Sequence, residues 1–267
     1  MEVNKGIKME QLNYIPTPHD AEYNTFKGFN VGLTSTASNK NVIQHIIPEY
    51  TPISNQLTTE SCVANATADA LEILMGLNNI NSVKQLSRLF IYYNARTLGG
   101  NSDVDGGCFI HNAFKSLSTL GVCSEDLWPF EQNNIFKQPS IFAYKQAYDN
   151  RITGAYRITS SGDSRLDDIV MSLDLNTPVV FGTGVSEEFL NAFGVDKVWT
   201  MPEKTLGNHA MIITGYKKEN GLKFYVRNSW GEEWGINGHC WFDSSYIKNQ
   251  FTNDIWVATY MDSLLID

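Results

Sequence analysis

The stretch Gln56-Leu-Thr-Thr-Glu-Ser-Cys62 runs directly into Val63-Ala-Asn-Ala-Thr-Ala-Asp-Ala-Leu71. The alanine-rich part favours a helix, which places Cys62 at its first turn. The first turn of a helix has unpaired N–H groups and the positive end of the helix dipole, about half an elementary charge. Both favour a thiolate over a thiol. We therefore predict that Cys62 is a nucleophile.

Composition limits the classes of protein to which this cysteine can belong. The chain has 267 residues, of which 42% are hydrophobic and 12% aromatic, enough for a substantial core in one large domain or two lobes. Its net charge of -9 argues against the basic face of nucleic-acid-binding proteins. No apolar run approaches the roughly 20 residues that span a bilayer. We therefore predict neither a nucleic-acid nor a membrane partner, and we expect a monomer.

The N-terminal region and the cysteine content bear on the cellular compartment. The first thirty residues contain no apolar segment of the kind that a secretory signal requires. We therefore expect synthesis in the cytoplasm, with export by another route left open. Four cysteines are too few for a disulfide scaffold, so any disulfide is optional.

The organisation of the chain changes near its middle. Residues 1–45 are rich in Asn, Ser and Thr, lack sustained periodicity and carry Pro16-Thr17-Pro18, which predicts an extended arm. Helical spacing of apolar residues predicts helices around Val63–Leu74 before Gly76, Leu86–Tyr93, Ile110–Leu120, Leu166–Leu173 and Ser186–Phe193. Short β-branched and aromatic runs predict strands at Pro178–Val185, Ala210–Tyr216, Lys223–Asn228, His239–Phe242 and Ile255–Tyr260. Helices followed by strands predict an α+β protein with separate lobes.

A nucleophilic cysteine needs a base, and His209 is the histidine best placed to supply it. His209 begins the apolar strand Ala210–Tyr216, which would hold its ring rigidly. Asn228 follows the next predicted strand, and its carbonyl oxygen can accept the distal ring N–H without adding a negative charge. Trp230 is close enough in sequence to shield that hydrogen bond from water. The other histidines, which lie in the arm, before the core or on other elements, are His19, His45, His111 and His239.

These residues together resemble the papain family of cysteine peptidases. Gln56 before Cys62, Asn208-His209-Ala210 and Asn228-Ser-Trp-Gly231 resemble the motifs of that family, in the family's order. The resemblance spans roughly residues 47–260. It implies a two-lobed α+β fold with the active site in the cleft between a helical lobe and an antiparallel, β-barrel-like lobe. We expect a catalytic domain over 46–267, with the helical lobe at about 55–150 and the β-rich lobe at about 151–260.

The resemblance also implies roles for individual residues. Gln56 would hold the oxyanion together with the Cys62 backbone N–H, and Asp105-Gly106-Gly107 resembles the glycine pair whose backbone binds an extended substrate. The substrate would be a peptide or protein, and a protein inhibitor would be a further partner. Neither a cofactor nor a metal is implied. The residues expected to contact substrate are Glu60, Gly106, Gly107, Cys108, Asn208, Ala210 and Trp230.

The nucleophile motif departs from the family at several positions. Val63 replaces an aromatic residue, Thr59 stands where typical members have a disulfide cysteine, and Glu60 stands where glycine is usual. A carboxylate at Glu60 would raise the thiol pKa if it faced the sulfur, or attract a basic substrate side chain if it faced the cleft. We predict a modest preference for basic residues.

Other readings of the same residues remain open at this point. A papain-like exopeptidase, amidase or transpeptidase would share Cys62, His209 and Asn228, and a binding module could keep the fold without the chemistry. Cys62 alone is also compatible with a small buried hydrophobic residue. Cysteine and histidine positions that could form part of a zinc site, although none has CxxC spacing, are Cys108, His111, Cys123, His239 and Cys240.

Two alternatives describe the arm of residues 1–45. It is either a short pro-segment that crosses the cleft as an inhibitory strap, or a belt attached to the surface elsewhere. Its length, its lack of a core and the proline-stiffened Tyr14–Pro18 segment are compatible with both.

Overall fold

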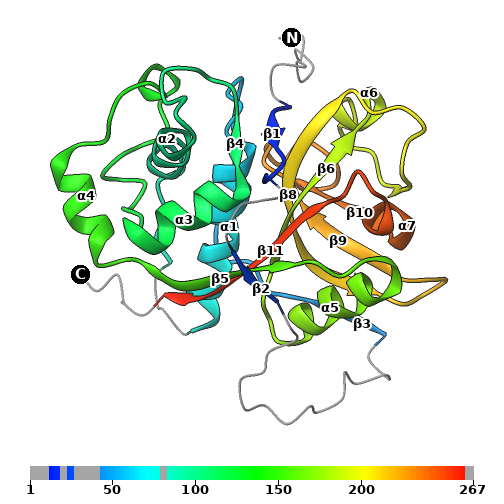
Figure 1. Cartoon of the computed structure of the whole chain (residues 1–267). Helices are drawn as coiled ribbons and strands as arrows, with labels where there is room; N and C mark the ends of the chain where they lie inside the picture. Colours follow the sequence, from blue (N-terminus) through cyan, green and yellow to red (C-terminus); the bar gives the residue numbers. More distant parts are fainter. Residues whose placement is uncertain (1–11, 19–22, 27–42, 79–82, 262–267) are drawn as a thin grey trace.

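The computed structural model describes residues 12–18, 23–26, 43–78 and 83–261. Figure 1 shows a helical lobe on one side and a sheet with accompanying helices on the other, with α1 between them. The helical lobe contains α1 (Cys62–Leu77), α2 (Arg88–Gly99), β4 (Cys108–Phe109), α3 (Ile110–Thr119), the short 3₁₀ helix η2 (Gln132–Asn134) and α4 (Ile141–Tyr148). The chain therefore has the predicted α+β architecture.

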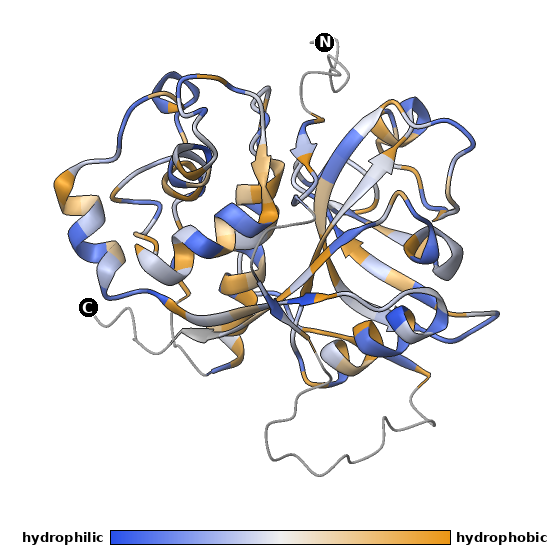
Figure 2. Cartoon of the chain, viewed as in Figure 1, coloured by the Kyte–Doolittle hydropathy of each residue, from blue (hydrophilic) through white to orange (hydrophobic). Residues whose placement is uncertain are grey.

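Helix α1 is the central element because small side chains let neighbouring elements approach it closely. It contacts α2 and α3 of the helical lobe and also β6, β8 and β11 of the sheet. Figure 2 shows its largely hydrophobic character, and only Leu74 and Leu77 of its side chains are not fully buried. The sequence predicted that the helix would end at Gly76, but α1 continues to Leu77. The glycine serves packing instead, since a Cβ atom there would lie 2.1 Å from the ring of Tyr50.

The sheet-containing part has more elements than the sequence predicted. Its helices are α5 (Gly162–Asp174), α6 (Glu187–Leu190) and α7 (Ser244–Lys248), of which α7 was not predicted. Its strands are β1 (Tyr14–Ile15), β2 (Asn24–Thr25), β3 (Gln44–Ile46), β5 (Ile152–Ile158), β6 (Val179–Val185), β7 (Val198–Trp199), β8 (Gly207–Lys217), β9 (Lys223–Arg227), β10 (His239–Asp243) and β11 (Asp254–Met261). The five predicted strands correspond to β6, β8, β9, β10 and β11.

Nine of these strands form one sheet in the order β2-β5-β11-β6-β8-β9-β10-β7, with β3 pairing on β8. Most neighbours are antiparallel, as predicted. Within the described residues the sheet is open, with β2 and β7 at the ends of its path, so the expected barrel-like lobe is not a closed barrel. β8 lies in the middle of the sheet and also contacts α1, which brings His209 to the junction of the two lobes.

The described parts of the arm occupy two places. Asn13 bridges to Asn208 at the start of β8, and β1 pairs in parallel with β4, Tyr14 opposite Cys108. Residues 12–18 therefore lie between the helical lobe and the sheet (Figure 1). A second segment, β2, pairs with β5 and forms one end of the sheet path. The described parts of the arm are thus extended, as predicted.

Helix length and composition also bear on membrane association. Among the described residues, no helix combines the length and apolarity that crossing a bilayer requires.

Candidate active site

Cys62 is the first residue of α1, as the sequence predicted, and it is fully buried. Burial raises the pKa of its thiol to about 12, and the charge of Glu60 adds to the rise. Hydrogen bonds from the backbone of Ala210, Val63 and Asn13 lower the pKa but do not offset the burial. The expectation that the helix N-terminus makes this thiol acidic is therefore wrong for the structure described here, in which Cys62 is fully buried. Desolvation destabilises the thiolate by more free energy than the helix N-terminus contributes to stabilising it.

His209 on β8 is also fully buried, and its ring is held by Asn228. The His209 Nε2 atom lies 2.7 Å from Asn228 Oδ1. That oxygen also accepts the Ser229 backbone N–H at 2.8 Å, which fixes the amide orientation. The proton of the neutral ring is therefore on Nε2, and Nδ1 is a buried atom without a hydrogen-bond partner in the described structure. Burial lowers the pKa of His209 to about 4, against the opposing effect of the Asn228 hydrogen bond.

Trp230 stacks on the imidazole ring. The centroids of His209 and Trp230 are 4.2 Å apart with an interplanar angle of 22°. Trp230 also packs edge-to-face against Trp234 and Phe189. This aromatic cover excludes water from the His209–Asn228 hydrogen bond, the arrangement that the sequence predicted for Trp230.

Gln56 is held by the segment that follows β9. Its backbone N–H donates to Ser229 O at 2.9 Å, and Ser229 Oγ donates to Gln56 Oε1 at 2.8 Å. The Gln56 Nε2 group donates to Thr59 O at 2.8 Å. Ser229 therefore turns the amide nitrogen of Gln56 toward the loop before Cys62. Sequence reasoning missed this positioning role, although Ser229 lies within the Asn228-Ser-Trp motif.

Tyr92 of α2 and Asp105 connect the segment before Cys62 with the segment before β4. The Gly107 N–H donates to the Tyr92 hydroxyl at 3.2 Å, and that hydroxyl donates to Asp105 Oδ1 at 2.5 Å. The same Asp105 oxygen accepts the Glu60 N–H at 3.1 Å. Gly107 has a φ of +74°, and a Cβ atom there would lie 1.6 Å from Asn13 O. Glycine is thus required both by the backbone conformation and by the close approach of the arm.

The arm segment passes directly over the thiol. Asn13 Nδ2 donates to Glu60 Oε2 at 2.7 Å, and the backbone of Asn13 hydrogen-bonds with Cys62. Further along, the Thr17 N–H and Oγ1 both donate to Asp254 Oδ2, at 2.9 and 2.5 Å. Glu60 therefore faces the arm and raises the pKa of the Cys62 thiol through its charge, which is the first of the two predicted effects. The attraction of a basic substrate side chain stays a prediction.

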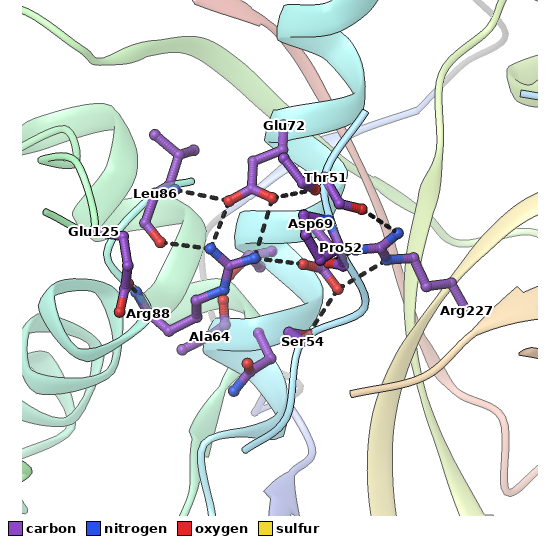
Figure 3. A network of polar contacts seen from close by, with 12 residues as sticks. Thr51, Pro52, Ser54, Ala64, Asp69, Glu72, Leu86, Arg88, Glu125 and Arg227 are labelled. Atoms are coloured by element: carbon purple, nitrogen blue, oxygen red, sulfur yellow. Dashed lines mark hydrogen bonds and ion pairs between the residues drawn. The ribbon is translucent and has the colours of Figure 1, made fainter. Parts of the chain in front are cut away.

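A buried charge network connects α1 to β9, the strand before Asn228 (Figure 3). Arg88 on α2 pairs with Asp69 at 2.7 Å and with Glu72 at 2.6 Å, both on α1. Arg227, the last residue of β9, contacts the other oxygen of Asp69 at 3.2 Å and Glu49 at 2.5 Å. The network therefore spans both lobes, and the residue directly before Asn228 belongs to it. Sequence reasoning did not identify it.

The remaining predicted residues divide into two groups. Asn208, Ala210, Gly107 and Cys108 lie beside the arm or the thiol, which is where substrate contacts were predicted. The cysteines and histidines considered for zinc do not converge. Within the described residues no three His, Cys, Asp or Glu side chains are grouped to hold a metal. All four cysteines are free thiols, and the rings of His111 and His239 pack on Trp256 and Tyr225.

Comparison with known proteins gives the same picture. The model of the papain family cysteine protease matches residues 41–257. A peptidase C1-like protein of Acanthamoeba polyphaga mimivirus is 32% identical over 83% of this chain and 74% of its own length. The chain also matches viral cathepsins, of which it spans 50% to 55%.

Solved structures extend the comparison to the fold. Xylellain, a cysteine protease from Xylella fastidiosa, superposes with a TM-score of 0.85 at 28% identity and covers 97% of this chain and 99% of its own. Procathepsin L 3 from the larval midgut of Tenebrio molitor shares the fold, with a TM-score of 0.67 at 19% identity, over 84% of this chain and 72% of its own. The family-model match and the mimivirus relative show that the chain belongs to the papain family of cysteine proteases.

Proposed function

We propose that this chain hydrolyses peptide bonds through Cys62 and His209. The observation that carries the proposal is the state of the imidazole: Asn228 and Trp230 hold the ring, while Nδ1 is buried without a hydrogen-bond partner in the described structure. His209 directly precedes Ala210, whose backbone hydrogen-bonds with Cys62, and an unengaged imidazole lone pair is what proton abstraction from a thiol requires. The family membership supports the same reading.

The chemical steps follow from these atoms. His209 Nδ1 takes the Cys62 proton, and the thiolate attacks the peptide carbonyl. The Gln56 Nε2 group and the Cys62 backbone N–H stabilise the resulting oxyanion, and one such donor is worth a factor of about 100 to 1,000 in rate. The C–N bond then breaks as the imidazolium gives its proton to the leaving amine. Water, deprotonated by His209, hydrolyses the thioester and restores the thiol.

Peptide digestion by the full-length chain carrying Tyr14→Ala, which removes a buried side chain of the arm, tests this function. We expect new internal termini in a peptide library, detected by mass spectrometry, and none with Cys62→Ala. Release of terminal residues alone would instead favour the exopeptidase. Ammonia release from side chains or peptide ligation would favour the amidase or transpeptidase. If Cys62→Ala kept full activity, Cys62 could not be the nucleophile.

Glu60 supports a preference for basic substrate residues. Its carboxylate already accepts a hydrogen bond from the side chain of Asn13, so a substrate side chain at that place would meet a negative charge. We expect Glu60→Gln to lower the ratio of kcat/KM for arginine over leucine substrates by about two- to fivefold, the effect of one partly exposed ion pair. An unchanged ratio would show that this carboxylate does not contact substrate.

We also propose that residues 12–18 inhibit the enzyme as a strap. Three features support this: the pairing of β1 with β4, the contact of Asn13 with the Cys62 segment, and the two hydrogen bonds from Thr17 to Asp254. With this segment in place, Cys62 and His209 have no exposed surface. Proforms of cathepsins among the structural neighbours support a pro-segment role, and the proposed partners are peptide or protein substrates.

A further inference from the structure

His239 is the first residue of β10, and both nitrogens of its ring lie at hydrogen-bond distance from oxygen atoms. Nδ1 is 2.6 Å from the carbonyl oxygen of Asn237, and Nε2 is 2.9 Å from Oε1 of Glu49. A backbone carbonyl can only accept a hydrogen bond, and so can an ionised carboxylate. A neutral imidazole has a single N–H, so it would satisfy one of these two oxygens and turn a lone pair toward the other.

Glu49 is ionised in this arrangement. Burial raises the pKa of its carboxyl group, but the hydrogen bond and charge of His239 and the charge of Arg227 outweigh burial and hold the pKa below its ordinary value. The second carboxylate oxygen of Glu49 accepts from Arg227 Nη1 at 2.5 Å. Because neither oxygen carries a proton, His239 has to donate from both ring nitrogens. The contacts therefore require an imidazolium, which carries a positive charge.

The surroundings of the His239 ring suit a cation. The rings of Tyr225 and His239 stack with centroids 4.7 Å apart and an interplanar angle of 3°, and the face of an aromatic ring attracts positive charge. Burial raises the pKa of Tyr225, so its hydroxyl is neutral. Arg227 lies opposite His239 in the register of β9 and β10, but the Glu49 carboxylate binds both cations. Glu49 thus supplies the negative charge that keeps the second proton on the ring.

The turn of residues 235–238 contacts the residue that holds the catalytic imidazole. Asn237 and Gly238 both have left-handed backbone conformations, with φ of +51° and +76°. The Gly238 carbonyl accepts the backbone N–H of Asn228 at 3.0 Å. His239 Nδ1 binds the carbonyl of the peptide group between Asn237 and Gly238. The imidazolium therefore holds the turn directly beside its contact with Asn228.

We infer that His239 is a positioning residue for catalysis, and that it acts in its doubly protonated form by joining Glu49 to the turn that binds the Asn228 backbone. Through Glu49 it also fixes Arg227, the residue before Asn228. A ring that lost its second proton would release either the turn or Glu49, and Asn228 would hold the His209 ring less precisely. The inference rests on the proposed peptidase function and adds a proton-dependent control to the same site.

The first experiment follows the His239 ring itself and needs no catalysis. The full-length chain carries isotope-labelled histidine, and the NMR signals of His239 are assigned by their absence in His239→Gln. We expect both ring nitrogens to have the chemical shifts of protonated nitrogen at about pH 6. Glu49→Gln removes the negative charge, so the second proton should be lost at lower pH. An unprotonated ring nitrogen in the unchanged chain at that pH, or an identical titration in Glu49→Gln, would overturn the inference.

The second experiment measures the hydrogen bond between Asn228 and His209. If His239 positions Asn228, His239→Gln should let the Nε2 proton of His209 exchange with solvent about three- to tenfold faster, the effect of roughly one hydrogen bond. His45→Gln is the matched control, because the His45 ring contacts Asn176 at an exposed place on β3. The control should leave the exchange rate unchanged. Equal rates in the unchanged chain and His239→Gln would contradict the positioning role.

Peptide hydrolysis supplies the third experiment. In the full-length chain carrying Tyr14→Ala, kcat and KM are measured against pH, per active site counted by alkylation of Cys62. We expect kcat to fall about three- to tenfold as the ring loses its second proton, with KM nearly unchanged, because Asn228 orients the base. Glu49→Gln should abolish this fall, since its amide nitrogen donates to the neutral ring while its oxygen still accepts from Arg227.

A purely structural role of His239 would reduce the amount of active enzyme without moving the pH profile. The same fall in kcat toward high pH in the chain with Glu49 and in Glu49→Gln would therefore overturn the inference. If no peptide were hydrolysed while the ring signals and the exchange rates behaved as expected, the peptidase proposal would fail. His239 would then stand as a proton-dependent support of Asn228.

Discussion

Iodoacetamide is expected to alkylate Cys62 at pH 7 at least about 1,000-fold faster in Tyr14→Asp than in the unchanged chain. The substitution places a carboxylate at the buried position of Tyr14 beside Asp254, and like charges in a buried site repel. The arm should therefore leave. In the closed arrangement burial holds the thiol pKa at about 12, so only about one molecule in 100,000 is a thiolate at neutral pH. When the arm leaves, water reaches Cys62 and the effect of burial on the pKa of its thiol is removed.

The pH dependence of arm docking has a definite sign at both ends. We call the chain with the arm docked the closed form and the chain with the arm released the open form. Burial lowers the pKa of His209 to about 4, so the closed form binds fewer protons than the open form between pH 4 and 6.5. The closed form therefore loses stability as the pH falls from 6.5 toward 4. Burial raises the pKa of Cys62 from 9.0 to about 12, so closed-form stability is complete below pH 9 and is lost toward pH 12. Docking should be strongest between these limits.

The same alkylation assay, run from pH 4 to 11, checks both statements. The control is Tyr148→Asp, which makes the same substitution at an exposed tyrosine of α4. We expect the control to follow the unchanged chain at every pH. If Tyr14→Asp also followed the unchanged chain, residues 12–18 would not protect the thiol and the inhibitory strap would be excluded.

Arg88→Met is expected to lower the free energy of unfolding by about 3–5 kcal/mol. Arg88 is almost fully buried, and both carboxylates that it pairs with, Asp69 and Glu72, lie on α1 without access to water. Methionine fills the volume but leaves the two carboxylates without this cation. Glu72 already has a raised pKa, because burial outweighs the lowering effect of Arg88. Without Arg88 we expect Glu72 to become protonated, at a cost to stability.

Chemical denaturation of Arg88→Met measures this loss. Lys197→Met is the matched control, since it breaks an ion pair with Glu188 whose partners are 37% and 72% exposed. Exposed pairs contribute about 0–1 kcal/mol, so the control should barely change the midpoint. A similarly small effect of Arg88→Met would mean that the buried network contributes no more than a surface pair.

Local sequence patterns predicted the elements that carry the site. The alanine-rich segment after Cys62, the strand that begins near His209 and the position of Asn228 were correct because periodicity and motif spacing are local properties. The papain family and the cysteine protease class, inferred from these motifs, are confirmed. The catalytic roles of the individual residues and the endopeptidase type stay predictions.

The contacts of the arm could not be predicted in the same way. Tyr14 meets Asn253 and Thr17 meets Asp254 across separations of 239 and 237 residues, and no periodicity marks such pairings. The raised pKa of Cys62 depends on its burial in the folded chain, so a helix terminus considered alone gave the wrong sign. The buried network was missed for a similar reason, since charged residues on a helix are usually solvated.

The end of β9 and the two residues after it are unusually sensitive to a shift in register. Three consecutive residues reach three different partners: Arg227 contacts Asp69 of α1, Asn228 holds His209, and Ser229 orients Gln56. A substitution removes one of these contacts and leaves two. A single inserted or deleted residue would instead present every side chain to the wrong partner, so His209, Gln56 and α1 would lose their alignment in one event.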